Sequence, residues 1–269
     1  MEENEKPRKR RAMIHVKDLR KEYTLEGGES VVALKRINLD IMEGELCCIF
    51  GTSGSGKSTL LNQLAGLEKP TFGDVYIRGV PITRLSENQL AAFRQKHIGF
   101  VFQSYNLLPF MNAVENVAMP LMFRGVPKEQ RERAARGVLK RVGLGHRLSH
   151  YPRQMSGGQQ QRVGIATALI TSPRLIIADE PTTALDSITQ RQIVDLLTSL
   201  VDDSGASMLF ITHDFSVLRR ATTRCYVLSE GHVVESGATS MLLECPTTPE
   251  ATNLVRAARE LSLDVEGGR

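Results

Sequence analysis

The chain has 269 residues, of which 41% are hydrophobic and 24% are charged, and its formal net charge is +4. This is the composition of an ordinary globular protein, and the length allows one large domain or one domain with an insert. No apolar run approaches the roughly 18–20 residues that cross a membrane, and the charged N-terminus MEENEKPRKRRA lacks the apolar stretch of a signal peptide. We therefore expect the chain to stay in the cytosol.

The first residues carry much of the excess positive charge. Lys6, Arg8, Lys9, Arg10 and Arg11 predict a solvated, disordered tail over residues 1–12. The alternative is a weak attraction of this tail to anionic lipid headgroups at a cytosolic membrane face. A nucleic-acid partner is not expected, since the chain has no Trp and only 5% aromatic residues on which bases could stack.

The first hundred residues alternate between strand and helix patterns. Short strands at 13–16, 33–41 and 45–50, separated by Gly-containing turns, predict a small antiparallel sheet that leads into the first core strand. Further on, the patterns predict a helix at 57–67, a strand at 74–78, a helix that opens at Ser86 and a strand at 97–103.

Residues 104–155 show helical patterns, notably 127–142, without convincing strands, which predicts a helical insert within an α/β frame. The α/β pattern then returns, with helices at 158–171, 187–201 and 215–221 and strands at 174–179, 207–212, 225–229 and 232–235. After Gly237 the chain predicts two short helices split by Pro246 and Pro249. These patterns favour one domain over 13–240, with its helical insert at about 104–160, and a helical C-terminal extension over 241–269.

The four cysteines are Cys47, Cys48, Cys225 and Cys245. They form no C-x-x-C pair, and the His spacing suggests no metal site, so reduced thiols are expected. Cys47 and Cys48 are neighbours on a predicted strand and should point to opposite faces of its sheet.

The clearest chemical motif is GTSGSGKS at residues 51–58, between the apolar run 46–50 and a predicted helix. This is the G-x-x-x-x-G-K-[ST] phosphate loop in its expected strand–loop–helix context. Gly51, Gly54 and Gly56 let successive N–H groups converge on anionic oxygens at a helix N-terminus. Lys57 adds a positive charge for the β- and γ-phosphates, and Ser58 offers a hydroxyl to Mg²⁺. The alternative is a glycine-rich loop with a lone surface lysine.

Two acids follow a strand that reads as buried on both faces. Asp179 and Glu180 end the sequence LIIADE, and parallel α/β sheets bind ligands at that edge. Because an acid there is costly unless it meets a cation, we expect Asp179 to be a partner of Mg²⁺, directly or through water. Glu180 is the candidate base for attack by water. The alternative is a pair of acids that caps the next helix.

Two other strands end in polar side chains. Gln103 could place its carbonyl on Mg²⁺ or on water, although a solvated amide explains this residue as well. His213 could hydrogen-bond a γ-phosphate, although a lone His at a strand end is more often a cap or a surface residue.

The segment MSGGQQQR places Ser156, Gly157 and Gly158 at the opening of a helix. A serine cap with free N–H groups makes a second anion site, although an ordinary cap without a ligand explains the same residues. One nucleotide has only one triphosphate, so a second chain or a second nucleotide would account for the additional site.

In this order, the motifs GTSGSGKS, Gln103, SGGQ, IIADE, TALD (183–186) and His213 resemble the nucleotide-binding subunit of an ABC transporter, over about residues 13–240. The resemblance implies a P-loop NTPase core with a mainly parallel sheet, an N-terminal antiparallel β subdomain and a helical signature subdomain. It also implies ATP and Mg²⁺ as cofactors. Met155 stands where the family usually has leucine, a volume-conserving change.

In this family two domains sandwich two ATP molecules head to tail. The resemblance therefore implies a second copy of the chain, whose Ser156, Gly157 and Gly158 reach the γ-phosphate held by Lys57. Tyr23 lies where the family places an aromatic residue that stacks on adenine, although a strand residue half packed on the surface explains it as well. Asp186 belongs to the loop that links the two sites. The residues expected to hold nucleotide are Tyr23, Gly51, Thr52, Ser53, Gly54, Ser55, Gly56, Lys57, Ser58, Thr59, Ser156, Gly157, Gly158, Gln159 and Asp186. The expected catalytic residues are Glu180, His213, Lys57 and Gln103, and the expected metal ligands are Ser58, Gln103 and Asp179.

Within the family, the stretch FVFQSYNLLPFMNAVENVAMPL is similar to the subgroup of macrolide exporters, lipoprotein-releasing complexes and bacitracin-type peptide resistance pumps. This similarity implies separate multi-span membrane subunits, which would contact residues 104–125, and a location at the cytoplasmic face of the membrane. Leu107, Leu108, Phe110 and Met111 could make this contact or could equally be core. The alternatives to transport are a soluble ABC ATPase of DNA repair or translation, and a kinase that uses the same phosphate loop. Neither the cargo nor a role for residues 246–269 follows from the sequence.

Overall fold

An antiparallel sheet forms the N-terminal part of the molecule. The structure is a computed structural model that describes residues 11–267, with side chains described as far as Arg259. Strands β1 (Ala12–Thr24), β2 (Ser30–Met42), β4 (Phe72–Ile77) and β5 (Val80–Pro81) pair in the order β2-β1-β4-β5. β1 and β2 are longer than predicted, because irregularities in their pairing, such as the one between Val16 and Leu19, interrupt the sequence alternation without ending the strands.

The central sheet has six strands within residues 11–267, in the order β10-β9-β3-β8-β7-β6. They are β3 (Leu46–Phe50), β6 (Ile98–Val101), β7 (Leu175–Asp179), β8 (Ser207–Thr212), β9 (Arg224–Ser229) and β10 (His232–Ala238). All neighbouring pairs are parallel except β9 and β10. The loops after β3, β7 and β8 therefore leave the sheet at the same edge, and this edge carries the site described below.

Two hydrophobic cores lie on opposite faces of the central sheet. Alternation along β3 sends Cys47 and Ile49 into the core shared with the antiparallel sheet, and Cys48 and Phe50 into the core shared with the helices. The first core includes α1 (Lys57–Leu64), and the second includes α5 (Gly157–Leu169) and α6 (Ser187–Ser204). The opposite faces predicted for Cys47 and Cys48 are confirmed, and both thiols are buried.

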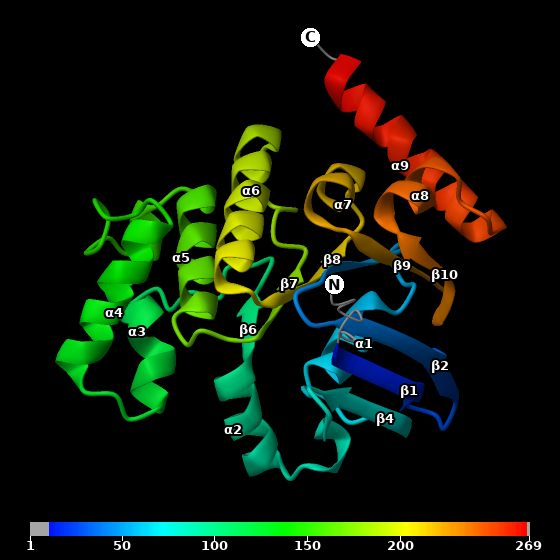
Figure 1. Ribbon diagram of the computed structural model, residues 1–269, viewed down its shortest axis with the longest axis horizontal. Helices are drawn as coiled ribbons and strands as arrows, with labels where there is room; N and C mark the ends of the chain where they lie inside the picture. The colour runs from blue at the N-terminus through cyan, green and yellow to red at the C-terminus, as the bar shows by residue number, and fades with distance from the viewer. Residues whose placement is uncertain (1–10, 268–269) are drawn as a thin grey trace, which may run out of the picture.

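The remaining helices extend this arrangement on two sides (Figure 1). α3 (Ala113–Phe123) and α4 (Lys128–Arg141) pack against α5, far from the antiparallel sheet, and α2 (Glu87–His97) runs into β6. Short 3₁₀ turns cover Ile82–Arg84 and Pro152–Gln154. The helical patterns predicted after residue 104 thus correspond to α3 and α4.

The C-terminal segment differs from its prediction. After α7 (Phe215–Ala221) and the β9–β10 pair, α8 (Thr239–Glu244) is short, but α9 (Pro249–Gly267) has 19 residues and packs against α7 and β10 (Figure 1). The predicted separation into two helices near Pro246 and Pro249 is confirmed, but α9 is not short: Pro249 occupies its first turn, where proline is tolerated, and starts this helix. Within the described residues, no helix is both long and apolar enough to cross a membrane. Residues 1–10 of the predicted basic tail lie outside the described residues, and Ala12 already belongs to β1.

Candidate functional site

The loop between β3 and α1 is built around glycine. Gly56 has a φ of 103°, a conformation that favours glycine, and a Cβ on it would lie 2.8 Å from the carbonyl oxygen of Ala33. A Cβ on Gly51 would lie 2.3 Å from the carbonyl oxygen of Leu228. Only glycine lets the loop pass this close to β2 and β9, and the close passage sets its curvature.

The N-terminus of α1 is open to an anion. The first N–H groups of a helix have no acceptor within the helix, and no described side chain caps α1, which begins at Gly56 and Lys57. The hydroxyl of Ser55, within the loop that precedes α1, is buried and has no hydrogen-bond partner among the described residues. Open N–H groups, a buried hydroxyl and the helix dipole together suit a phosphate.

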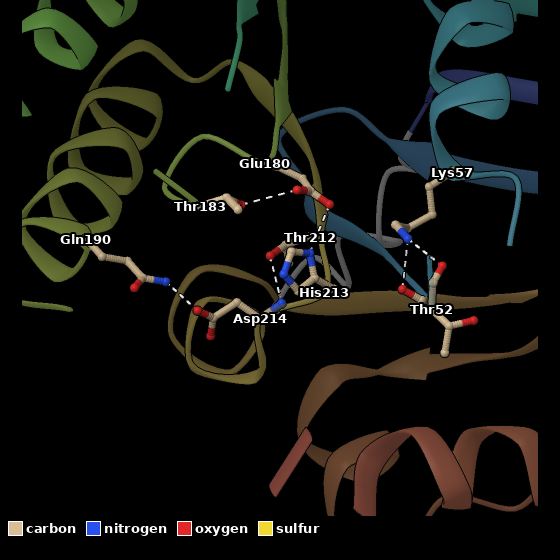
Figure 2. A network of polar contacts seen from close by, with 9 residues as sticks. Thr52, Lys57, Glu180, Thr183, Gln190, Thr212, His213 and Asp214 are labelled. Atoms are coloured by element: carbon tan, nitrogen blue, oxygen red, sulfur yellow. Dashed lines mark hydrogen bonds and ion pairs between the residues drawn. The ribbon is translucent and has the colours of Figure 1, made fainter. Parts of the chain in front are cut away.

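Lys57 lies across this loop. Its Nζ donates hydrogen bonds to the carbonyl oxygens of Gly51 and Thr52, at 2.9 and 2.7 Å (Figure 2). Burial lowers the pKa of Lys57, an effect that the nearby carboxylates of Glu180 and Asp179 partly offset. The lysine is therefore a buried cation held over the loop, next to the two acids at the end of β7, Asp179 and Glu180.

Asp179 and Glu180 end β7 in different environments. Burial, and then the like charge of Glu180, raise the pKa of Asp179, while Lys57 opposes the rise. Glu180 has a φ of 43°, held by the bond from its N–H to the carbonyl oxygen of Ile211 at 2.9 Å. A non-glycine residue in this region stores about 1–3 kcal/mol of strain, and such residues cluster at functional sites.

The side chain of Glu180 connects two loops. Its Oε1 lies 2.9 Å from Nδ1 of His213, and its Oε2 accepts a hydrogen bond of 3.2 Å from the hydroxyl of Thr183 (Figure 2). Since the carboxylate only accepts hydrogen bonds, Nδ1 of His213 carries the proton in this contact. The imidazole is thereby oriented, and its Nε2 remains available to a ligand.

Asp214 fixes the segment after His213. It caps α7, accepting hydrogen bonds from the N–H groups of Ser216 and Val217 at 2.7 and 3.3 Å, and it also accepts one from Gln190 of α6. Its own N–H donates to the hydroxyl of Thr212 at 2.9 Å. The sequence reasoning missed this role of Asp214, for which the only signal was an acid at the start of a helical pattern.

A cavity of about 890 Å³ brings these groups together. Its lining includes the predicted residues Gly51, Thr52, Ser53, Gly54, Gly56, Lys57, Ser58, Thr59, Glu180 and His213. β2 contributes Val31, Val32, Ala33 and Lys35 to one wall, and α9 contributes Leu254, Ala257 and Ala258. The contribution of α9 has no counterpart in the sequence analysis.

Several predicted residues lie outside this lining. Tyr23 donates a hydrogen bond to Glu68 at 2.8 Å, and Nζ of Lys21 lies 5.0 Å from the centre of its ring. Gln103 is exposed beyond β6, at the far edge of the central sheet from β10. Asp186 caps α6 through the N–H of Thr189 at 3.0 Å.

The predicted second anion site is also outside the cavity. Ser156 is exposed and caps α5, where its hydroxyl accepts from the N–H of Gln159 at 3.4 Å, and Oε1 of Gln159 accepts from the N–H of Ser156 at 3.2 Å. A Cβ on Gly157 or Gly158 would lie 2.7 Å from the hydroxyl of Tyr105 or 2.5 Å from Cγ2 of Thr189, respectively, so these side chains would have to shift. The ordinary capping interaction is therefore present, and the O–H of Ser156 is still able to donate.

Gln161 is a second residue that the sequence reasoning missed. Its side chain is completely buried in α5, and its Nε2 donates to the carbonyl oxygens of Phe102 and Pro181 at 3.3 and 2.5 Å. Phe102 precedes Gln103, and Pro181 follows Glu180. The helix that begins at Ser156 is thus tied to both of these segments, although one glutamine among three in a row gave no signal for this role.

The donors near the loop fit a hard divalent cation. Among the described residues no three His, Cys, Asp or Glu side chains cluster tightly enough to hold a metal by themselves. Mg²⁺ is usually bound by one or two protein oxygens together with phosphates and waters. The half-buried Asp179, destabilised in its charged form by burial and by Glu180, and the hydroxyl of Ser58 are ligands of that kind.

This fold and this site define a nucleotide-binding ATPase cassette with a phosphate loop. The model of the ABC transporter family matches residues 34–183, more than half of the chain, so the chain belongs to the ABC transporter family. The family inferred from the ordered motifs and the predicted α/β fold are both confirmed.

Three relatives illustrate the similarity. The lipoprotein-releasing system ATP-binding protein LolD of Pseudomonas fluorescens is 45% identical over 224 residues, which cover 83% of this chain and 98% of LolD. The macrolide export ATP-binding/permease protein MacB of Rhodopseudomonas palustris is 43% identical over 241 residues, which cover 90% of this chain but 36% of MacB. The ATP-binding cassette MJ0796 of Methanocaldococcus jannaschii, solved as a dimer in a post-hydrolysis state with ADP and Pi, is 42% identical. It superposes with a TM-score of 0.78 over 84% of this chain and 99% of that one.

Proposed function

We propose that this chain binds and hydrolyses ATP as the cytoplasmic subunit of a membrane ABC transporter, and that it powers export of a substrate, or its extraction from the membrane, through separate transmembrane subunits. Residues 13–240 would form the ATPase domain, with the helical insert at about 104–160, and 241–269 would extend it. Membership of the family and the presence of Lys57, Glu180 and His213 around one cavity support the proposal.

One observation carries the proposed arrangement of two copies. The cavity holds the phosphate loop, Glu180 and His213, whereas the exposed Ser156 at the start of α5 lies outside it. One chain would therefore have two anion-binding helix ends, and only the start of α1 lines this cavity. In a head-to-tail pair, Ser156, Gly157 and Gly158 of one copy would complete the cavity of the other, as the dimeric state of the cassette MJ0796 suggests.

Lys57, Glu180 and His213 would have different roles in hydrolysis. The N–H groups of the loop and the ammonium of Lys57 would stabilise charge on the β- and γ-phosphates, which is the main source of catalysis in phosphoryl transfer. Glu180 would orient the attacking water and accept its proton, and Nε2 of His213 would hold the γ-phosphate. The contact of 2.9 Å between Glu180 and His213 would align these two groups.

Ser58 and Asp179 would hold Mg²⁺, which would supply positive charge to neutralise the phosphates. Gln103, which the structure leaves exposed, would approach this cluster only with the closing of the two copies. Tyr23 would pack on the adenine, and Asp186 would contact the partner copy near the paired sites.

The membrane subunits would dock beside α2. An apolar groove of about 550 Å³ there is lined by Leu67, Ala91, Ala92, Arg94, Gln95, Ile98, Phe100 and Phe123. Phe123 and Phe110 are 68% and 70% exposed, whereas Leu107 packs against the helical core. The proposed contact with residues 104–125 would thus involve Phe110 and Phe123 and extend to α2, and with it the chain would lie at the cytoplasmic face of the membrane.

Hydrolysis by the purified chain tests this function. The variant Glu180→Gln should keep ATP binding, because the phosphate loop is intact, and should lose about 10²–10⁴-fold in kcat, the usual contribution of a general base. Phosphate release and ATP titration measure the two effects, and light scattering should show an ATP-bound dimer of this variant.

Steady-state hydrolysis by Glu180→Gln near the parent rate would contradict the assignment of the base. Purification from detergent-solubilised membranes separates the alternatives, since a copurifying multi-span protein supports transport, whereas copurifying DNA or ribosomes would support a soluble ABC ATPase.

A further inference from the structure

The C-terminal helix α9 reaches the wall of the nucleotide cavity. Leu254, Ala257 and Ala258 line this cavity together with Lys57 and His213, although about 200 residues of chain separate α9 from the phosphate loop. α9 packs against α7, the helix that begins directly after His213 and Asp214. The helix is therefore in a position to influence where His213 lies.

The start of α9 is fixed to the central sheet. The carboxylate of Glu235 on β10 accepts hydrogen bonds from the N–H groups of Thr247 and Thr248, at 2.9–3.1 Å, and from the hydroxyl of Thr248 at 2.9 Å. The same hydroxyl accepts from the N–H of Ala251 at 3.3 Å. These bonds tie the segment immediately before α9 to β10 and so fix where α9 begins.

Further along α9, Arg259 contacts both helices that α9 covers. Its guanidinium lies 6.0 Å from the centre of the ring of Phe215, the first residue of α7, and it donates a hydrogen bond to the carbonyl oxygen of Leu243 in α8. Between Thr248 and Arg259, the α9 residues Val255 and Ala258 are buried in the same core as Leu218 of α7. Arg259 thus braces the N-terminal end of α7, two residues after His213.

We infer that Arg259 is a positioning residue for His213, and that α9 acts in hydrolysis by holding the start of α7 while its inner face closes one side of the nucleotide cavity. This inference rests on the proposed function. Arg259 touches neither the phosphate loop nor Glu180 in any contact described above, so its effect passes through Phe215 and the segment that begins at His213.

The inference is tested with the variant Arg259→Ala in the full chain, using Mg-ATP. A small displacement of His213 should lower kcat by about 3- to 10-fold, less than the roughly 10²-fold that a 1 Å misplacement can cost. The KM for ATP and the affinity measured by ATP titration should change less than kcat, because the phosphate loop is untouched and only the contact from His213 is displaced. Amide hydrogen exchange should become faster within Phe215–Ala221, without a general increase across the central sheet.

Two variants give the comparison. Arg256→Ala removes an arginine from the same helix whose described bond is local, to Oδ1 of Asn253 at 2.9 Å, and it should leave kcat and exchange unchanged. Arg259→Lys keeps a cation over the ring of Phe215 but has no planar fork, so it should give an intermediate kcat.

Equal kcat and equal exchange of α7 in Arg259→Ala and Arg256→Ala would overturn the inference. A loss of ATP affinity as large as the loss in kcat, or a global rise in exchange, in Arg259→Ala would also overturn it, since either result indicates an effect beyond the position of His213. If the wild-type chain hydrolyses no ATP, the proposed function fails, and the exchange measurement still decides whether Arg259 holds α7.

Discussion

Replacing Gln161 by leucine should remove the hydrogen bonds that connect α5 to the segments at Phe102 and Pro181, without changing any group in the cavity. The side chain of Gln161 is completely buried, and its Nε2 supplies a donor to the carbonyl oxygens of Phe102 and Pro181. Leucine has a similar volume but no donor, so both carbonyl groups would lose a partner within the protein. A buried polar group that loses its partner costs about 1–3 kcal/mol.

The net cost is smaller than the sum of these two losses. Oε1 of Gln161 is itself buried without a partner among the described residues, and leucine removes this unsatisfied acceptor. The bond to Phe102 is long, at 3.3 Å. We therefore expect Gln161→Leu to lower the free energy of unfolding by about 2 kcal/mol, which corresponds to a fall in Tm of roughly 4–8 °C for a domain of this size.

The neighbouring residue provides a matched control. Gln160 donates one hydrogen bond, to the carbonyl oxygen of Met155 at 3.1 Å, and this bond is only partly buried. Gln160→Leu should cost less than about 1 kcal/mol, because water can replace the lost donor. Thermal unfolding and kcat should be measured for both variants, and kcat should fall only in Gln161→Leu, whose target carbonyls flank Gln103 and Glu180. Equal Tm and kcat in the two variants would refute the reasoning.

Three further outcomes follow from contacts in the structure. Lys57→Ala should weaken ATP binding by roughly 10- to 100-fold, the value of a lost charge-assisted hydrogen bond, and an unchanged ATP titration would contradict its role. Phe123→Asp should abolish copurification of a membrane protein while leaving ATPase activity intact, and retained copurification would exclude the groove beside α2. Tyr226 has a pKa raised to about 12 by burial, from 10.0, so the wild type should lose stability as the pH rises from 10 to 12, by roughly 2 kcal/mol. Tyr226→Phe should lack this part of the loss in urea unfolding at the two pH values, and identical pH dependence of the two proteins would count against it.

The short-range chemistry of this chain could be predicted from the sequence. A phosphate loop is defined by eight consecutive residues, and the loop glycines, Lys57 and the helix that follows lie where these residues require them. The buried strand before Asp179 and the strand before His213 ended where their apolar runs ended. Parallel strands then bring these ends to one edge, so the meeting of Lys57, Glu180 and His213 at one cavity followed from the fold class.

Contacts between distant segments could not be predicted in this way. The bond from Gln161 to Pro181 and the packing of α9 on α7 depend on how helices cross, and single glutamines and alanines carry no pattern that reports such crossings. The two prolines correctly predict the break between α8 and α9, but they carry no information on how far α9 continues after Pro249, and its 19 residues are more than the sequence pattern predicts. The strands predicted for β1 and β2 are too short, because bulges disturb the alternation by which a strand is identified in sequence.

The position of the phosphate loop also determines when this chain becomes able to bind nucleotide during its synthesis. The loop belongs to the first quarter of the chain, yet the N–H of Gly231 donates to the carbonyl oxygen of Ser55 at 3.0 Å, and β3 lies between β8 and β9. These partners leave the ribosome only after about 170 further residues have been made. An emerging chain therefore presents the complete eight-residue motif long before it has a rigid loop, and truncated products that end before β8 should have the motif without the affinity.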